Sequence, residues 1–487
     1  MIEDPNKIVV DYCRGLFTRL DEFFVRATGR SATEFATIES FGQAIRTSSH
    51  DPDLARRGES AFVWLDNEVR SWVAKGGIKA FSAARQLGGM KLVLGGGSRF
   101  QESELNSVSS SVLYSDTVLI PDPIMPWLER PRTEERFQHV LVLQAAHALL
   151  HLKPLIDADL PYPAIVVFPS YEKSLEEHDQ QTMEGISRLI ADVVSYYLKE
   201  PMTSIEEVRD YANFHPEKFC SAIEANRLFV APGGDIGEPL AEGLKRYQET
   251  IKTWRSQDWN TQYERLPQHL QVLNVIWERL APFYHFLENA QEFCGHPLMC
   301  IEQHAHYFSL LSKTCSARLE ELGVVQPKTR ALADAIGSQR LRWIGEIPAE
   351  TLVTLRQENA NEAFRTRLSQ AFERLRVAEF TDMEKVTAEV CHEIDSLVAD
   401  HDKELRSLRE KYRRTHGQTA ALALGGAAAA FIPVLAPFLG SAVPFMIALK
   451  YGHDKVAELA EKRSLSRSLV GVLAHARQKG LKEAKSG

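Results

Sequence analysis

Apolar positions in the first ninety residues recur every three or four residues. Val9, Tyr12, Leu16, Leu20 and Phe23 would all lie on one face of an α-helix. A helix with one apolar face is stable when that face packs on a core. We therefore expect residues 1–89 to form an N-terminal helical region.

The pattern changes after residue 89. Short, continuous apolar runs that end in glycine or proline replace the helical spacing; the three runs are MKLVLGGGS, TVLIPDPI and PAIVVFPS. Continuous rather than alternating apolar runs are typical of strands that are buried on both faces, which favours a parallel sheet. Residues 90–201 are therefore predicted to form a small α/β subdomain.

Helical spacing returns for the rest of the chain. It predicts a helical domain over 202–335 and then a long antiparallel helical stalk over 336–416. The first stalk helix is expected to begin near Pro348 and to run without a break to about Phe380, because good helix formers fill that segment. The fold class is thus mainly α, with a helical bundle and stalk, a small α/β subdomain and a C-terminal apolar helical hairpin.

The hairpin is predicted from an uncharged segment near the C-terminus. No ionisable side chain occurs from Gly417 to Leu449, which is longer than the roughly 20 residues that a spanning helix needs. Pro433, Pro437 and Pro444 divide the segment into arms too short to cross a bilayer. Basic residues on both sides favour a hairpin over 417–450 with both ends on the cytoplasmic side, followed by an amphipathic basic tail helix over 451–487.

Two interpretations of this hairpin stay open. Alanine and glycine bury little apolar area, so the segment suits either conditional insertion into a membrane or an Ala-rich core sheltered by the stalk. In the first case, lipid or neighbouring helices would contact Gly425, Gly426, Phe431, Ile432, Phe438, Gly440, Phe445 and Met446. Head groups would be contacted by Arg409, Arg413, Arg414 and Lys450.

A stalk leading through basic residues into an apolar hairpin resembles the general layout of α-helical pore-forming proteins. The resemblance implies a membrane-directed helical effector, pore-forming or membrane-disrupting, with a soluble sensing body, as in bacterial defence or toxin systems. Its partners would be membrane lipid or partner helices, and further copies of the chain in a homo-oligomer. A helical scaffold that uses the same hairpin to bind a partner chain is an alternative function.

Charge and cysteine usage narrow the compartment and the partners. The net charge is -8 and the pI is about 6.1, which argues against a surface that tracks nucleic acid, so no specific nucleic acid is expected. The first residues lack the basic and apolar regions of a secretory signal, and the six cysteines are scattered. We therefore expect a cytoplasmic protein with reduced thiols that associates peripherally or conditionally with the inner membrane.

The α/β subdomain offers a different class of function. Gly95, Gly96, Gly97 and Ser98 follow the first predicted strand, where backbone N–H groups can face a phosphate. The glycines match neither the spacing of a dinucleotide fingerprint nor a P-loop. Together with Asp122 and Ser170 after the next two strands, they predict a pocket at the carboxyl ends of the sheet. The alternative function is therefore a soluble enzyme or a nucleotide-binding protein.

Two histidine-containing segments have a spacing that could suit a metal ion. Cys300 and His304 could hold zinc because they are four residues apart, with Cys294 or His296 completing the ligand set from the preceding loop. No other cofactor is predicted. His147 and His151 have the same spacing, but the helix around them is so apolar that packing in a core or at an interface is favoured.

One nuclease motif also occurs. Arg209, Asp210 and His215 in RDYANFH resemble the motif of HEPN RNases, and Arg279 and His285 form a second, poorer copy. The resemblance implies an RNase, although arginine and histidine at this spacing are also expected by chance in a chain of this length. Common nucleophile, zinc-protease and kinase motifs are absent from the sequence, so catalysis stays an open question.

Overall fold

The computed structural model describes most of the N-terminal three quarters of the chain. The described residues are 4–35, 38–48, 52–94, 108–109, 111–129, 138–169, 176–252, 255–293, 295–298, 302–321, 349–359, 362–377 and short pieces between 385 and 397. The predicted apolar hairpin and tail helix, 417–487, lie outside these residues. Within the described part of the chain, no helix has both the length and the apolar character to cross a bilayer.

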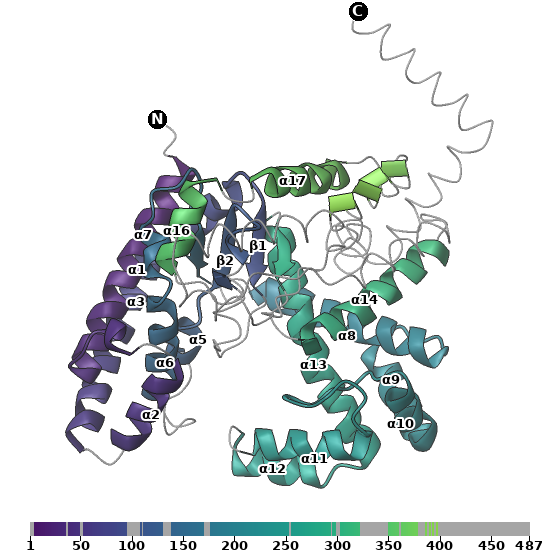
Figure 1. Ribbon diagram of the computed structural model, residues 1–487. Coiled ribbons are helices and arrows are strands. Elements are labelled where there is room, and N and C mark those ends of the chain that lie inside the picture. Colours follow the sequence, from purple (N-terminus) through teal and green to yellow (C-terminus); the bar gives the residue numbers. More distant parts are fainter. Residues whose placement is uncertain are drawn as a thin grey trace, which may run out of the picture.

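Helices make up most of the described residues, as the apolar spacing predicts (Figure 1). They are α1 (Pro5–Thr28), α2 (Ile38–Ser48), α3 (Pro52–Gln86), α5 (Met125–Leu128), α6 (Gln138–Leu150), α7 (Lys153–Asp157), α8 (Glu176–Leu198), α9 (Ile205–Phe214), α10 (Pro216–Ala225), α11 (Leu240–Ile251), α12 (Gln257–Glu264), α13 (Gln268–Glu292), α14 (Glu302–Glu321), α16 (Ala349–Gln357) and α17 (Glu362–Val377), with a 3-10 turn, η1, at Ala32–Glu34.

A small parallel sheet lies between two groups of helices. Its strands are β1 (Lys91–Leu94), β2 (Thr117–Pro121), β3 (Ile165–Phe168) and β4 (His296–Leu298). All neighbours pair in parallel, in the order β3-β2-β1-β4. The three apolar runs found in the sequence form β1, β2 and β3. The fourth strand comes from the region predicted to be a helical domain, so the sheet extends beyond residues 90–201.

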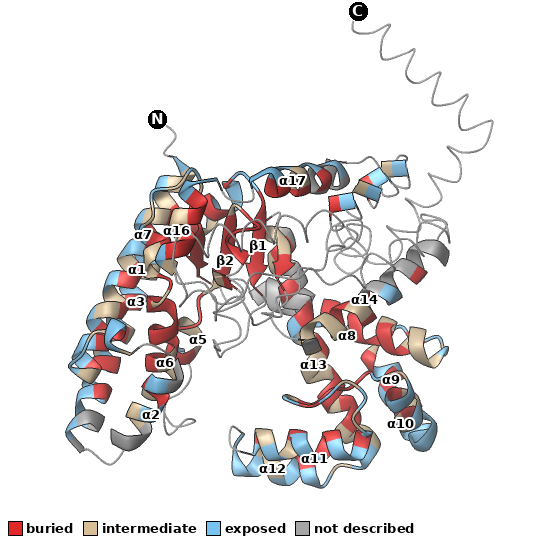
Figure 2. Ribbon diagram, viewed as in Figure 1, coloured by how far each residue is buried: buried red, intermediate tan, exposed pale blue. Residues whose placement is uncertain are grey.

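Helices cover the sheet beside its two outer strands, β3 and β4. Figure 2 shows β1 and β2 in red, and the side chains of Leu92, Val118 and Ile120 are fully enclosed. Helices α1 and α3 contact β3 at one edge, and α13 contacts β1 and β4 at the other. Every residue of β1 and β3 is buried, so side chains on both faces of the sheet are enclosed, which explains why the strand sequences are continuous apolar runs.

The N-terminal helix shows how local sequence sets an element. Asp4 caps α1 by accepting a hydrogen bond from the Asn6 N–H at 3.0 Å, and Pro5 begins the helix. Gly29 ends it in the left-handed conformation, with φ of 76°. The five residues of the predicted apolar stripe are all buried, which confirms the helical face.

Two buried clusters divide the described apolar residues. One joins α1 and α3 to the sheet, α6, α16 and α17, and the other joins helices α8 to α14. In the second cluster the Tyr307 hydroxyl accepts a hydrogen bond from the Val230 N–H at 2.7 Å. The sheet therefore shares its core with α16 and α17, which follow the second group of helices in the sequence.

The predicted unbroken helix after Pro348 is wrong in one respect. The structure divides it into α16 and α17, and Asn359 between them has φ of 56°. Asparagine tolerates this left-handed conformation better than most residues. The Asn359 N–H donates to the Arg356 carbonyl at 3.0 Å and the Glu362 N–H donates to the Asn359 carbonyl at 3.2 Å, so the break is a hydrogen-bonded turn.

Candidate functional site at the edges of the sheet

The order of the strands creates a point where the chain reverses its direction across the sheet. From β1 the chain adds β2 and then β3 on one side, and later returns to add β4 on the other side of β1. Leu94 at the end of β1 pairs with Leu298 at the end of β4. In open parallel sheets, ligands bind outside the carboxyl ends of the two strands at such a reversal.

Asp122 lies at this carboxyl edge, directly after β2. Its backbone N–H donates to the Phe168 carbonyl at 2.9 Å, which continues the pairing with β3. Its Oδ1 accepts from the N–H of Ile124 at 2.8 Å and, more weakly, from that of Met125 at 3.4 Å. The Oδ2 atom is buried and has no hydrogen-bond partner among the described residues, and Asp122 is 3% exposed.

Burial sets the protonation behaviour of this carboxyl group. Desolvation raises the pKa of Asp122 to about 6, the two backbone N–H groups oppose the rise, and the charge of Glu129 adds to it. The group is therefore ionised above about pH 6 while one of its oxygens lacks a donor. A buried carboxylate oxygen without a donor is a site where a ligand hydroxyl or amine can bind.

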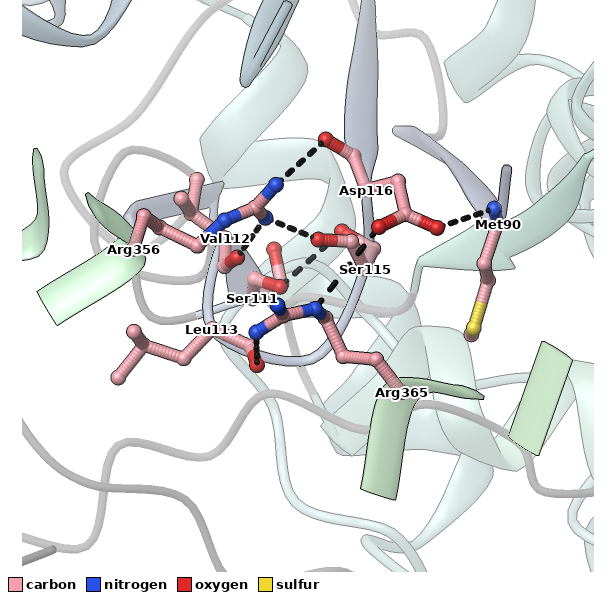
Figure 3. Close-up of polar contacts among 8 residues, drawn as sticks. All are labelled: Met90, Ser111, Val112, Leu113, Ser115, Asp116, Arg356 and Arg365. Atoms are coloured by element: carbon pink, nitrogen blue, oxygen red, sulfur yellow. Dashed lines mark hydrogen bonds and ion pairs between the residues drawn. The ribbon is translucent and has the colours of Figure 1, made fainter. Parts of the chain in front are cut away.

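The opposite, amino edge carries two buried arginines from the C-terminal helices (Figure 3). The Arg356 guanidinium donates to the carbonyls of Val112 at 2.6 Å, Ser115, and Asp116 at 3.3 Å. These carbonyls lie just before β2. Arginine donors close to the last carbonyls of a helical turn satisfy acceptors that have no partner within the turn.

Arg365 completes this cluster from α17. It donates to the Leu113 carbonyl at 3.4 Å, and its Nε lies 3.8 Å from the Asp116 carboxylate. The other Asp116 oxygen accepts from the Met90 N–H at 2.8 Å. Burial lowers the pKa of both arginines, that of Arg356 to about 10, while Asp116 opposes the shift. Both arginines remain charged at neutral pH and are bound by protein atoms, so the cluster is structural.

The predicted ligand and membrane residues fall outside the described part of the chain. Gly95 to Ser98 follow Leu94 in the sequence, and Ser170 follows β3, but the structure describes neither segment. The same holds for all twelve lipid and head-group contacts predicted between Arg409 and Lys450. Of the residues proposed for the carboxyl-edge pocket, Asp122 is the described one.

The structure describes only some of the predicted metal ligands. Cys294 and Cys300 lie outside the described residues, whereas His304 lies on α14 with its ring 5.6 Å from that of Phe283. Burial and the charge of Arg279 lower the pKa of His304 to about 4. In the described residues, no group of three or more His, Cys, Asp or Glu side chains could hold a metal ion.

His147 is buried in the core, one of the two predicted packing arrangements, and His151 lies beside it at a half-buried position. Their Nε2 atoms lie 3.3 Å apart, and the ring of His147 stacks against the ring of Phe41 at 4.5 Å and against that of Phe24 at 5.6 Å. Burial, with a smaller effect from His151, lowers the pKa of His147 to about 4. The imidazole is therefore neutral at physiological pH and acts as an aromatic core residue.

The HEPN-like residues lie at the end of α9. Arg209 and Asp210 are exposed on the helix, but α9 ends at Phe214 and Pro216 begins α10. His215 occupies the turn between these helices and is exposed, with φ of -133°. It therefore leaves the regular helical geometry that the sequence spacing assumes.

No known protein family, curated protein or solved structure matches this chain. The class of protein is therefore defined by the fold alone. It is a mainly helical protein built around a small parallel sheet. The strand order, β3-β2-β1-β4, is that of the first four strands of a doubly wound sheet.

Proposed function

We propose that this protein binds a nucleotide at the carboxyl edge of the sheet, where β1 and β4 end side by side. The observation that carries the proposal is the strand order β3-β2-β1-β4. In doubly wound sheets with this order, the nucleotide lies across the ends of the two strands at the reversal. The Asp122 oxygen at the same edge that has no hydrogen-bond partner among the described residues supports it.

The sequence after β1 supports the same site. Leu94 is followed directly by Gly95, Gly96 and Gly97. Glycines after the first strand of such a sheet allow backbone N–H groups to approach a phosphate without obstruction by a Cβ atom. The phosphates would therefore bind above β1, between the neighbouring strands β2 and β4.

The proposal is tested by equilibrium binding of NAD+, ATP, GTP and ADP-ribose to the full chain. We expect saturable binding of at least one of them, and at least a tenfold loss of affinity in Gly96→Val. Gly42→Ala is the matched control, because a Cβ added at Gly42 in α2 meets no atom within 4 Å. If none of the four compounds binds to the folded chain, the proposal is wrong.

A second proposal concerns the C-terminal segment. We propose that nucleotide binding controls a membrane-directed effector segment, 417–449, in a cytoplasmic homo-oligomer that associates conditionally with the inner membrane. The uncharged sequence of that segment favours it. The contacts of Arg356 and Arg365 also support it, because they join α16 and α17, which precede the segment, to the residues directly before β2.

This second proposal predicts leakage of vesicles. The full chain should release dye from vesicles of phosphatidylethanolamine and phosphatidylglycerol, and a chain lacking 417–449 should not. A double charge reversal, Arg413→Glu with Arg414→Glu, should weaken leakage, whereas replacing both residues by lysine should preserve it. Leakage that survives the deletion would exclude the segment from the mechanism.

A further inference from the structure

We infer that Asp122 accepts a hydrogen bond from the 2′-hydroxyl of a ribose, so that the ligand is a ribonucleotide with a free 2′-hydroxyl. The inference rests on the proposed nucleotide site and goes beyond it, because it names the ligand class and the residue that selects it. It depends on where Asp122 lies in the sheet, how its carboxylate is held, and which of its oxygens has no donor among the described residues.

The position follows from the strand register. Val93 pairs with Leu119, so Leu94 at the end of β1 is level with Ile120. Asp122 lies two residues farther along β2, which places it about 7 Å beyond that level toward the carboxyl edge. β2 is the direct neighbour of β1. A nucleotide whose phosphates lie above the end of β1 therefore has its sugar within reach of the end of β2.

The orientation of the carboxylate is fixed by the backbone. The Asp122 N–H is bound to β3 through the Phe168 carbonyl, and Oδ1 accepts from Ile124 and Met125. These hydrogen bonds restrict rotation of the carboxylate, because rotation would break the bonds to Oδ1. Oδ2 stays as an acceptor in a fixed place, which is the arrangement that a selective binding site needs.

A ligand hydroxyl is the group best suited to donate a hydrogen bond to Oδ2. Oδ2 is buried and has no donor among the residues that the structure describes, and an ionised oxygen in that state is unfavourable until a donor arrives. A sugar hydroxyl supplies one proton without bringing charge. A 2′-phosphate brings negative charge toward the carboxylate, and a 2′-deoxy sugar brings no donor. Asp122 should therefore select against both of these variants of a ribonucleotide.

The experiment compares matched ligand pairs on the full chain. Equilibrium binding is measured for NAD+ against NADP+, and for ATP against 2′-deoxy-ATP. In whichever pair binds, we expect the compound with the free 2′-hydroxyl to bind at least tenfold more tightly. Equal binding of both members by the unmodified chain overturns the inference without any variant.

Asp122→Asn then tests the residue. Asparagine preserves the Oδ1 acceptor for Ile124 and Met125 but removes the charge and places a donor amide where Oδ2 lies, so the preference should fall to twofold or less. Asp116→Asn, the same change at the amino edge, should leave the preference unaltered. If both variants retain the full preference, the inference fails while the nucleotide site stands. If none of the probes binds, the proposed function fails first.

Discussion

Buried charged groups at the amino edge of the sheet, where the strands begin, differ from Asp122 at the carboxyl edge, where the strands end, in whether their polar atoms have partners. At the amino edge each buried or half-buried charged group has a partner: Lys91 donates to the Arg85 carbonyl at 3.0 Å, and Asp116 lies between Met90 and Arg365. At the carboxyl edge Asp122 has one oxygen without a partner among the described residues. Arg356 and Asp122 are similarly buried, at 5% and 3% exposure, so depth does not explain the difference.

The comparison separates charge that stabilises the fold from charge that does not. The amino-edge groups satisfy backbone atoms that burial would otherwise leave unpaired. The Asp122 carboxylate does the reverse, since its raised pKa means that ionisation is less favourable in the folded chain than in water. A residue that opposes stability at neutral pH is a reason to look for function at the same place.

The largest predicted effect tests the amino edge. Arg356→Met should lower the free energy of unfolding by about 4 kcal/mol, because the carbonyls of Val112, Ser115 and Asp116 lose their donor while they stay buried. Arg367→Met, at a half-buried position on α17, is the control and should change it by less than about 1 kcal/mol. Urea unfolding of both variants measures the difference. Equal effects would mean that the buried cluster contributes nothing specific.

The second prediction concerns the sign of the effect at each edge. The pKa of Asp122 is raised from 3.8 to about 6, so its contribution to stability is present below about pH 4 and is lost as pH rises through about 6. Asp122→Asn should therefore stabilise the ligand-free chain by up to about 3 kcal/mol at pH 8 and by almost nothing at pH 4.

The same substitution at the amino edge should have the opposite sign. Asp116→Asn weakens the interaction with Arg365 and the charge-assisted bond from the Met90 N–H, so it should destabilise the chain at pH 8 by about 1 to 2 kcal/mol. Unfolding of both variants in denaturant at pH 4 and pH 8 provides the four values needed. Destabilisation by both variants at pH 8 would remove the contrast between the edges.

The sequence predicts one part of this arrangement well. The stripe from Val9 to Phe23 predicts α1, because a helix packed on one side repeats its buried positions. The runs that became β1, β2 and β3 are visible because strands buried on both faces have no polar positions. Asp122 was predicted at the carboxyl edge since it directly follows one of these runs. The spacing of apolar residues is thus sufficient to predict an element whose buried positions repeat at regular intervals.

Long-range pairing explains what the sequence could not predict. β4 is three residues long, and it is a strand because Val93 and its neighbours on β1 pair with it across about 200 residues of chain. Arg356 and Arg365 lie in a segment of good helix formers, where an arginine is usually solvated. Nothing in their local sequence indicates that their partners are carbonyls more than 200 residues away.

A last predicted effect tests how closely the amino edge is packed. Gly89 has φ of 73°, and a Cβ at that position would lie 2.7 Å from the Asp116 Oδ2 atom that accepts from Met90. Gly89→Ala should therefore cost about 2 kcal/mol, from the left-handed backbone and the displaced carboxylate. Gly42→Ala in α2 has open space around the added Cβ and should instead stabilise by about 0.5 to 1 kcal/mol. Thermal unfolding compares the two variants, and a stabilising Gly89→Ala would mean that Asp116 is free to move away from Met90.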